Sequence, residues 1–436
     1  MPSEKHKEME KIVQQFKDIQ FQLRKDEVWR FVDFSALLTD ELCQPVSGER
    51  QTVGYHCNIP DLEADRMVVE NGYCYHPMTV TDEGVIMGGL RNVCEGKADF
   101  VRQYLGKSIL RENPYQKFNN ENYTDGLFVY IPDGVSVKKP IQIQSVVNAG
   151  HGLFLQVRNL VVVGRGSHVT LIHCDDSYDN STSFANNLTE INVGENSYVE
   201  YYKMQNLNNQ TGLLNHAFVT MAQGASFRSV SITLNGGHIR NHTEVRMMGE
   251  HCDVQAHGLY LNDQEQQVDN YIFVDHAFPN CQSRELYKGI LDDTARGTFN
   301  GHVLVRDGAT KTEAYQSNKN ILLTDKAFVQ TKPFLEIYND DVKCSHGSTI
   351  GQLDEQALFY IRSRGISERT ARTLLLYAFC DEVLQQIGLE PLRDRLSDLV
   401  KKRLHGELTV CSECALHCSS PCNGPEVNFQ IDPTKL

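Results

Sequence analysis

Two groups of side chains in this chain of 436 residues could bind a metal ion. The first group lies in the segment 335–351, LEIYNDDVKCSHGSTIG, where Cys344 and His346 stand two positions apart. Residues two apart on an extended strand point to the same face. A thiolate and an imidazole on one face form half of a site for iron or another thiophilic metal, and the neighbouring Lys343 could lower the pKa of the thiol.

Two ligands do not complete a four-coordinate metal site. The remaining ligands would have to come from elsewhere in the fold, from a second subunit or from bound sulfide. The alternative is structural, with a buried cysteine beside a surface histidine on a turn that Gly347 permits. The spacing alone leaves both interpretations open.

The second group is a set of four cysteines near the C-terminus: Cys411, Cys414, Cys418 and Cys422. Their spacing is C-x2-C-x3-C-x3-C, so four thiols within twelve residues could close on zinc or on a [4Fe-4S] cluster. The spacing matches neither a zinc ribbon nor a ferredoxin. The surrounding Gly, Pro and Ser are also typical of a disordered tail with reduced thiols.

Four histidines lie close together in the sequence: His238, His242, His251 and His257. Strand alternation gives no reason for them to converge on one ion, so we expect structural roles. No GxSxG or HExxH motif occurs, and Gly106-Lys107-Ser108 lacks the upstream glycine of a phosphate loop because Val101 stands there. ATP chemistry is therefore excluded.

Composition narrows the class of partner. The 56 acidic and 42 basic side chains leave a net charge of −14, which disfavours nucleic acid and anionic membrane surfaces as partners. The N-terminus is too charged for a signal peptide, and no apolar run approaches the length of a membrane span. The 13 cysteines, an odd number, fit reduced thiols in the cytoplasm.

The elements that must position these residues follow from the apolar pattern. Helices are expected over 4–25 and 91–107 and, after Gly351, over 354–364, 367–388 and 391–405. Between 127 and 350, short apolar or alternating runs are each closed by Gly, Asn or Asp. The pattern divides the chain into a mixed helical region at 1–125, a β core at 126–350, a helical domain at 351–406 and a cysteine-rich tail at 407–436.

Small residues recur within the β core. Ser167, Ser197, Ala225 and Cys252 follow the same kind of turn and are 30, 28 and 27 positions apart. This nearly constant spacing is typical of the coils of a solenoid and predicts a mainly β protein built as a parallel β-helix. A β-sandwich is the alternative.

A long block of the sequence resembles a known family. The run AYQSNKNILLTDKAFVQTKPFLEIYNDDVKCSHGSTIGQLDEQALFYIRSRGI, 314–366, is similar to the signature of the SufB/SufD family of iron-sulfur cluster assembly proteins. EVWRFVDF at 27–34 and DGLFVYIPDGVSVKKPIQI at 125–143 support the resemblance. Ser345-His346-Gly347 stands where SufB carries Glu-His-Glu, so the chain is most similar to the SufD branch.

The resemblance implies a right-handed parallel β-helix between N-terminal and C-terminal helical regions, acting as a scaffold and not as an enzyme. It implies pairing with SufB through the β-helix ends and binding of the SufC ATPase through the C-terminal helices. A transient iron-sulfur cluster would form at the SufB-SufD interface, with His346 facing it and Cys344 beside it. When isolated, such a chain is expected to form a homodimer.

A carbohydrate-active β-helix is the alternative function. Such enzymes use paired carboxylates along the solenoid, and Asp292-Asp293 and Asp340-Asp341 would be the candidates. The absent export signal, the aromatic content of 9% and the helical C-terminus argue against it.

Overall fold

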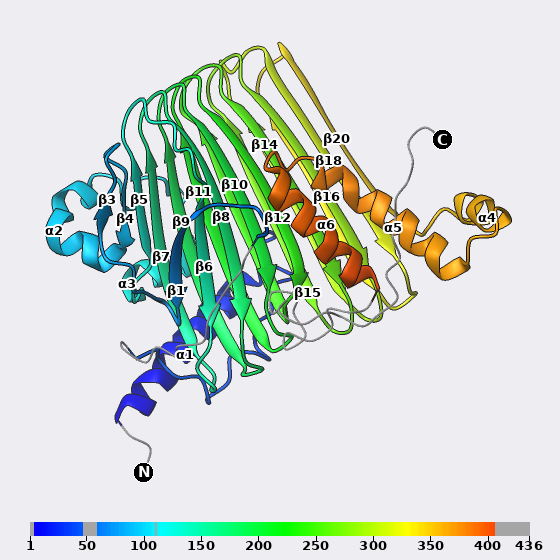
Figure 1. Cartoon of the computed structure of the whole chain (residues 1–436), viewed down its shortest axis with the longest axis horizontal. Coiled ribbons are helices and arrows are strands. Elements are labelled where there is room, and N and C mark those ends of the chain that lie inside the picture. The colour runs from blue at the N-terminus through cyan, green and yellow to red at the C-terminus, as the bar shows by residue number, and fades with distance from the viewer. Residues whose placement is uncertain (1–3, 47–58, 110, 406–436) are drawn as a thin grey trace.

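A computed structural model describes residues 4–46, 59–109 and 111–405 (Figure 1). Two ten-stranded sheets dominate it. The first sheet contains, in spatial order, β2 (Tyr73–Cys74), β1 (Asp65–Glu70), β6 (Ile141–Val147), β8 (His168–Ser177), β10 (Tyr198–Asn206), β12 (Ser226–Asn235), β14 (Asp253–Asn262), β16 (Gln282–Leu291), β18 (Thr312–Leu322) and β20 (Val342–Gly351).

The second sheet contains, in spatial order, β19 (Phe328–Ile337), β17 (Arg296–Val305), β15 (Gln267–His276), β13 (His238–Met247), β11 (Thr211–Met221), β9 (Ser183–Val193), β7 (Phe154–Val163), β5 (Leu127–Ile131), β4 (Ile86–Gly89) and β3 (Thr79–Val80). From β5 onward, successive strands alternate between the two sheets, and each pairs in parallel with the strand two positions away. This arrangement is a parallel β-solenoid and confirms the predicted fold class.

The small residues of the repeat stack at one corner of the solenoid. Ser167, Ser197 and Ala225 are buried, and each carbonyl accepts a backbone hydrogen bond from the next coil, at 2.9, 2.8 and 3.1 Å. Each small residue follows a left-handed residue, with φ of 62° at Gly166, 54° at Asn196 and 67° at Gly224. The corner therefore needs a residue that tolerates positive φ and then a side chain small enough to point inward.

Hydrophobic side chains fill the space between the sheets and also coat both outer faces. Helices α1 (Glu4–Leu23) and α3 (Pro114–Asn122) cover the second sheet, where Phe16 packs against Tyr115 and Phe184 at centroid distances of 4.8 and 5.0 Å. Helix α2 (Leu90–Arg102) packs beside β5 and β7. It kinks at Lys97 and ends five residues earlier than predicted.

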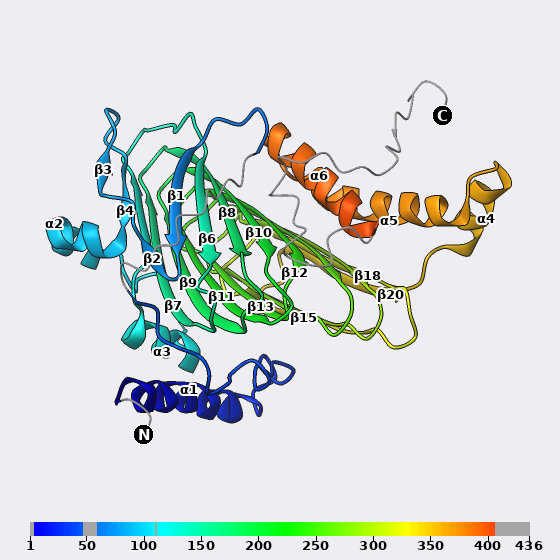
Figure 2. The ribbon, with the colours of Figure 1, turned by 60° about the horizontal axis from the view of Figure 1, so that its bottom comes forward.

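The first sheet is covered from the C-terminal side. Helices α5 (Glu368–Leu384) and α6 (Glu390–Leu404) bury Leu384 and Leu396 against its outer face, and Ile387 in the connection between them is buried there too (Figure 2). The predicted N-cap of α5 is confirmed, because the Ser367 hydroxyl accepts a hydrogen bond from the Thr370 backbone N–H. Helix α4 (Glu355–Ser363) buries none of its residues. No helix among the described residues is long and apolar enough to cross a bilayer.

Candidate functional site

The two ends of the solenoid differ. At the N-terminal end, the short antiparallel strands β2 and β3 terminate the sheets. At the other end, within the part of the chain that the structure describes, β20 pairs only with β18 and β19 only with β17, so two ten-residue strands have an unpaired edge (Figure 1). We call this end, formed by β19 and β20, the open end. An unpaired strand edge offers free N–H and C=O groups to another chain.

His346 and Cys344 lie on β20, at the open end. In the parallel ladder, Cys344 is paired with Ala314 and His346 with Gln316, so both residues face the same side of the first sheet as their partners. Cys344 is half-buried against the last interior hydrophobic cluster. His346 is exposed and has no hydrogen-bond partner among the described residues.

The expected effect of Lys343 on Cys344 is wrong. Lys343 lies on the opposite face of β20, and its Nζ is 3.0 Å from Glu313 Oε1, which raises the pKa of the lysine. Burial instead raises the pKa of the Cys344 thiol. The thiol is therefore protonated at neutral pH, and a metal ion or an approaching cation would have to displace the proton before it binds.

Sequence analysis missed two residues, Glu285 and Gln316, that lie in line with His346 on the neighbouring strands. The register places Glu285, Gln316 and His346 in one row across β16, β18 and β20. Gln316 Nε2 donates to Glu285 Oε2 at 2.5 Å, and burial raises the pKa of Glu285 to about 8. Their positions, 31 and 30 residues apart, repeat the coil period, which is the signal that could have found them.

Gly301 makes room for this row from the opposite sheet. A Cβ at Gly301 would lie 2.2 Å from Gln316 Nε2, so the glutamine side chain crosses the interior and reaches the second sheet. Gln316 thus fills the interior one coil before His346, and the exposed imidazole is the last member of this row, at the open end.

Within the described residues, no group of three or more His, Cys, Asp or Glu side chains could hold a metal ion. No described residue of these types joins Cys344 and His346 as a third ligand. Cys411, Cys414, Cys418 and Cys422 lie outside the described residues.

The four clustered histidines do not converge. His238 is buried with its Nε2 2.6 Å from Asp269, and buried His242 lies 3.0 Å from Glu244. His257 is buried on the outer face of the first sheet, whereas His251 is an exposed turn residue with φ of 60°. These contacts fit the structural roles that the sequence indicates.

The two acidic pairs that a carbohydrate-active β-helix would use also lie far from each other. Asp292 and Asp293 lie in the turn from β16 to β17, where their carboxylates accept backbone hydrogen bonds from Asp293 and Gln264. Asp340 and Asp341 lie in the turn from β19 to β20. The two turns join the sheets at opposite edges, a strand length of about 33 Å apart, whereas glycosidic carboxylates lie within about 10 Å.

Helix α4 projects from the solenoid near the open end (Figure 2). Phe359 and Tyr360 on this helix are 74% and 59% exposed. Two adjacent exposed aromatic side chains on a helix without buried residues are typical of a surface that binds another protein.

Comparison with known proteins decides the family. Residues 146–379 match the model described as "SUF system FeS cluster assembly, SufBD core domain", and residues 6–143 match "SufBD protein N-terminal region". This chain belongs to the SufBD family. The core match covers β7 to β20, α4 and most of α5, and therefore most of the solenoid and the open end.

Individual SufBD relatives agree. An iron-sulfur cluster assembly SufBD family protein of Synechocystis is 29% identical over 394 residues, which is 87% of either chain. The iron-sulfur cluster assembly protein SufD of Escherichia coli is 31% identical over 280 residues, covering 64% of this chain and 63% of that protein. SufD of Bacillus subtilis is 25% identical over 328 residues, covering 74% and 75%.

Proposed function

We propose that this chain is a SufD-like scaffold subunit of the SUF system that pairs with SufB through its open end. A nascent iron-sulfur cluster would form between the two subunits, as the product of the assembly and not as a resident cofactor. His346, with Cys344 behind it, supplies donors from this side. The observation that carries the proposal is an exposed imidazole without a partner on an unpaired edge strand, beside a single thiol.

The split site has a physical rationale. A scaffold must hold iron and sulfide strongly enough to assemble them and weakly enough to release them. Donors divided between two subunits meet both needs, because a change in the contact between the subunits changes the affinity for the cluster. We place the SufC ATPase, which would drive this change, on the exposed aromatic face of α4.

The test is His346→Ala in the complex reconstituted from this chain, SufB and SufC. We expect the yield of assembled cluster, measured by visible absorbance and iron content, to fall at least tenfold while the complex still forms. His151→Ala is the matched control, because His151 is also exposed but lies in the turn between β6 and β7. Full assembly with the His346 variant would exclude a role for this imidazole.

We further propose that Cys411, Cys414, Cys418 and Cys422 hold zinc or iron. The test compares the full chain with a truncation that ends at Gly406, after anaerobic reconstitution and metal analysis. The full chain is expected to hold metal at one more site than the truncation does. Equal metal content of the two would eliminate the idea.

A further inference from the structure

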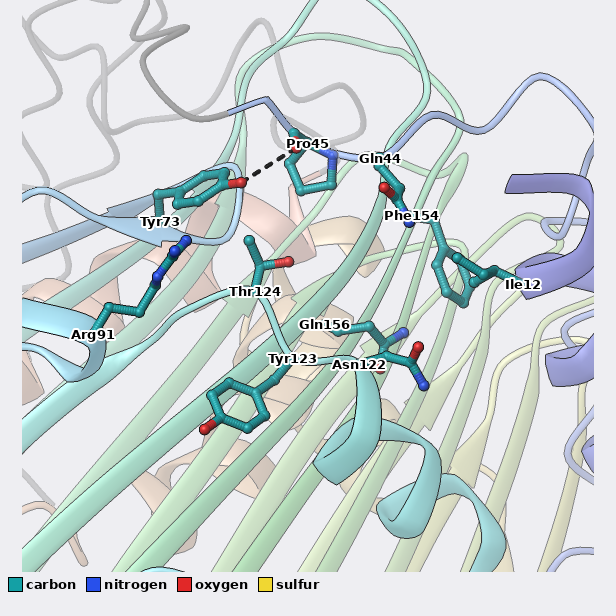
Figure 3. A pocket seen from close by; sticks show the side chains of 10 residues that line it. All are labelled: Ile12, Gln44, Pro45, Tyr73, Arg91, Asn122, Tyr123, Thr124, Phe154 and Gln156. Atoms are coloured by element: carbon teal, nitrogen blue, oxygen red, sulfur yellow. Dashed lines mark hydrogen bonds between the residues drawn. The ribbon is translucent and has the colours of Figure 1, made fainter. Parts of the chain in front are cut away.

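A cavity of about 470 Å³ lies at the N-terminal end of the solenoid, remote from β19 and β20. Its walls come from α1, residues 44 and 45, β2, the start of α2, the end of α3, and β7 (Figure 3). This volume is in the range that accommodates a small-molecule ligand. The proposed assembly function does not use this cavity.

The cavity carries a positively charged side chain, whereas the net charge of the chain is negative. Among the described residues that line it, Arg91 is the only charged one, in a protein of net charge −14. The guanidinium is exposed and forms no hydrogen bond or ion pair with any described residue, and the carboxylate that it influences is the buried Asp125. Figure 3 shows it extending toward the ring of Tyr73. An arginine without a partner in a concave site attracts an anion, and its planar fork matches a carboxylate or a phosphate.

The backbone of Arg91 is held in place. Its N–H donates to Asp125 Oδ1 at 3.0 Å, and the same carboxylate accepts from the Cys74 N–H at 3.1 Å. Leu90 N–H donates to the Gly126 carbonyl. Asp125 is buried, so it fixes the start of α2 against β2 while the guanidinium remains available.

A second, independent feature lies on the other side of the cavity. Gln156 is only 4% exposed, its Oε1 accepts from Asn186 Nδ2 at 2.8 Å, and its Nε2 has no partner in the described structure. A buried amide donor without a partner lowers the stability of the fold. An acceptor bound in the cavity would remove this effect. Thr124 adds a polar group between Gln156 and Arg91, and Gln44 adds another on the side of Phe154 (Figure 3).

We propose that this cavity binds a small polar molecule that carries one carboxylate or phosphate group. Arg91 binds the acid, Gln156 donates to an acceptor at the other end of the ligand, and Phe154 and Ile12 form the apolar wall.

The test is isothermal titration calorimetry of the full chain with three probes: glycerol 3-phosphate, lactate and glycerol. We expect saturable binding of at least one acid and none of glycerol at the same concentrations. The acid that binds identifies the preferred group. Arg91→Gln should lower the affinity at least tenfold, and Gln156→Met should weaken binding without abolishing it.

Arg102→Gln is the matched control, because Arg102 is an exposed arginine of the same helix that pairs with Asp99. It should bind as the native chain does, and circular dichroism should show that every variant is folded. The proposal is overturned if neither acid binds saturably, if glycerol binds as tightly as the acids, or if Arg91→Gln leaves the affinity unchanged.

Discussion

Arg158 and Glu190 form an ion pair with both side chains fully buried on the outer face of the second sheet, 2.6 Å apart. Glu190 also accepts the backbone N–H groups of Gly106 and Ser108 at 2.8 and 3.1 Å. This carboxylate therefore fixes the segment after α2 to β9. Removing it would leave a buried guanidinium unpaired and two N–H groups without acceptors.

We expect Glu190→Ala to lower the free energy of unfolding by about 3–5 kcal/mol. The comparison is Asp133→Ala, which breaks the exposed pair between Asp133 and Arg165 and should lower the free energy of unfolding far less than Glu190→Ala does. Urea denaturation followed by the fluorescence of buried Trp29, the only tryptophan, measures both. Equal decreases in the free energy of unfolding would mean that the buried pair stabilises the fold no more than the exposed pair does.

Glu285 gives the protein a pH-dependent stability. Native Glu285 keeps its proton up to about pH 8, whereas the ordinary pKa of a glutamate is 4.5. Between these two pKa values, Glu285 is ionised in the unfolded chain but protonated in the native state. The free energy of unfolding therefore falls as pH rises from about 4.5 to about 8, by on the order of a few kcal/mol. Glu285→Gln removes the titration and should flatten the decline of the melting temperature between pH 5 and pH 8.

Glu195→Gln is the control for this prediction, because Glu195 is exposed in the turn between β9 and β10. It should keep the native pH profile. A Glu285 variant that declines as steeply as the native chain would show that other groups set the pH dependence.

At the residue scale, sequence reasoning could place Cys344 and His346 on one face, because strand geometry requires it. It could not show that β20 is the last strand of its sheet, because this depends on the chain leaving the solenoid after Gly351 to form α4. It also assigned the wrong neighbour to Cys344, because residues adjacent along a strand point to opposite faces. Lys343 consequently binds Glu313 on β18, the neighbouring strand of the first sheet.

At the element scale, the solenoid was predictable because each coil repeats a local requirement. A left-handed residue and then a small one recur from Gly166-Ser167 to Asn280-Cys281 and Gly308-Ala309. Helix α3 and strands β2 to β4 were not predictable. They are short, and their stability comes from contacts with distant residues, such as Asn119 Nδ2 donating to the carbonyls of Val157 and Asn186.

Helices α4 and α5 follow each other in sequence, but only α5 buries side chains against the first sheet. Leu384 on α5 is buried against the first sheet, so Leu384→Ala should lower the free energy of unfolding by about 2–5 kcal/mol. Phe359→Ser on α4 should leave stability unchanged, because this side chain is exposed, but should weaken binding of SufC. Thermal unfolding and a pull-down with SufC separate the two effects. Unchanged SufC binding by the Phe359 variant would exclude α4 as the docking surface.

At the scale of the whole molecule, the difference between the two ends determines what the chain can assemble into. Among the described strands, only β19 and β20 present long unpaired edges, and Pro333 removes one backbone donor from β19. Joining two open ends leaves no further edge of this kind. The geometry therefore favours a closed pair of subunits over a filament.

We expect the isolated chain to form a homodimer through β20, in which a second copy takes the place of SufB. Ile350 is 50% exposed at this edge, so Ile350→Lys should convert the dimer to a monomer without lowering the melting temperature. Met248→Lys is the matched control, because Met248 is also 50% exposed but lies in the turn between β13 and β14. Light scattering after size-exclusion chromatography measures the mass. Species larger than two chains would contradict the argument from a single open end, and a dimer that survives Ile350→Lys would place the contact elsewhere.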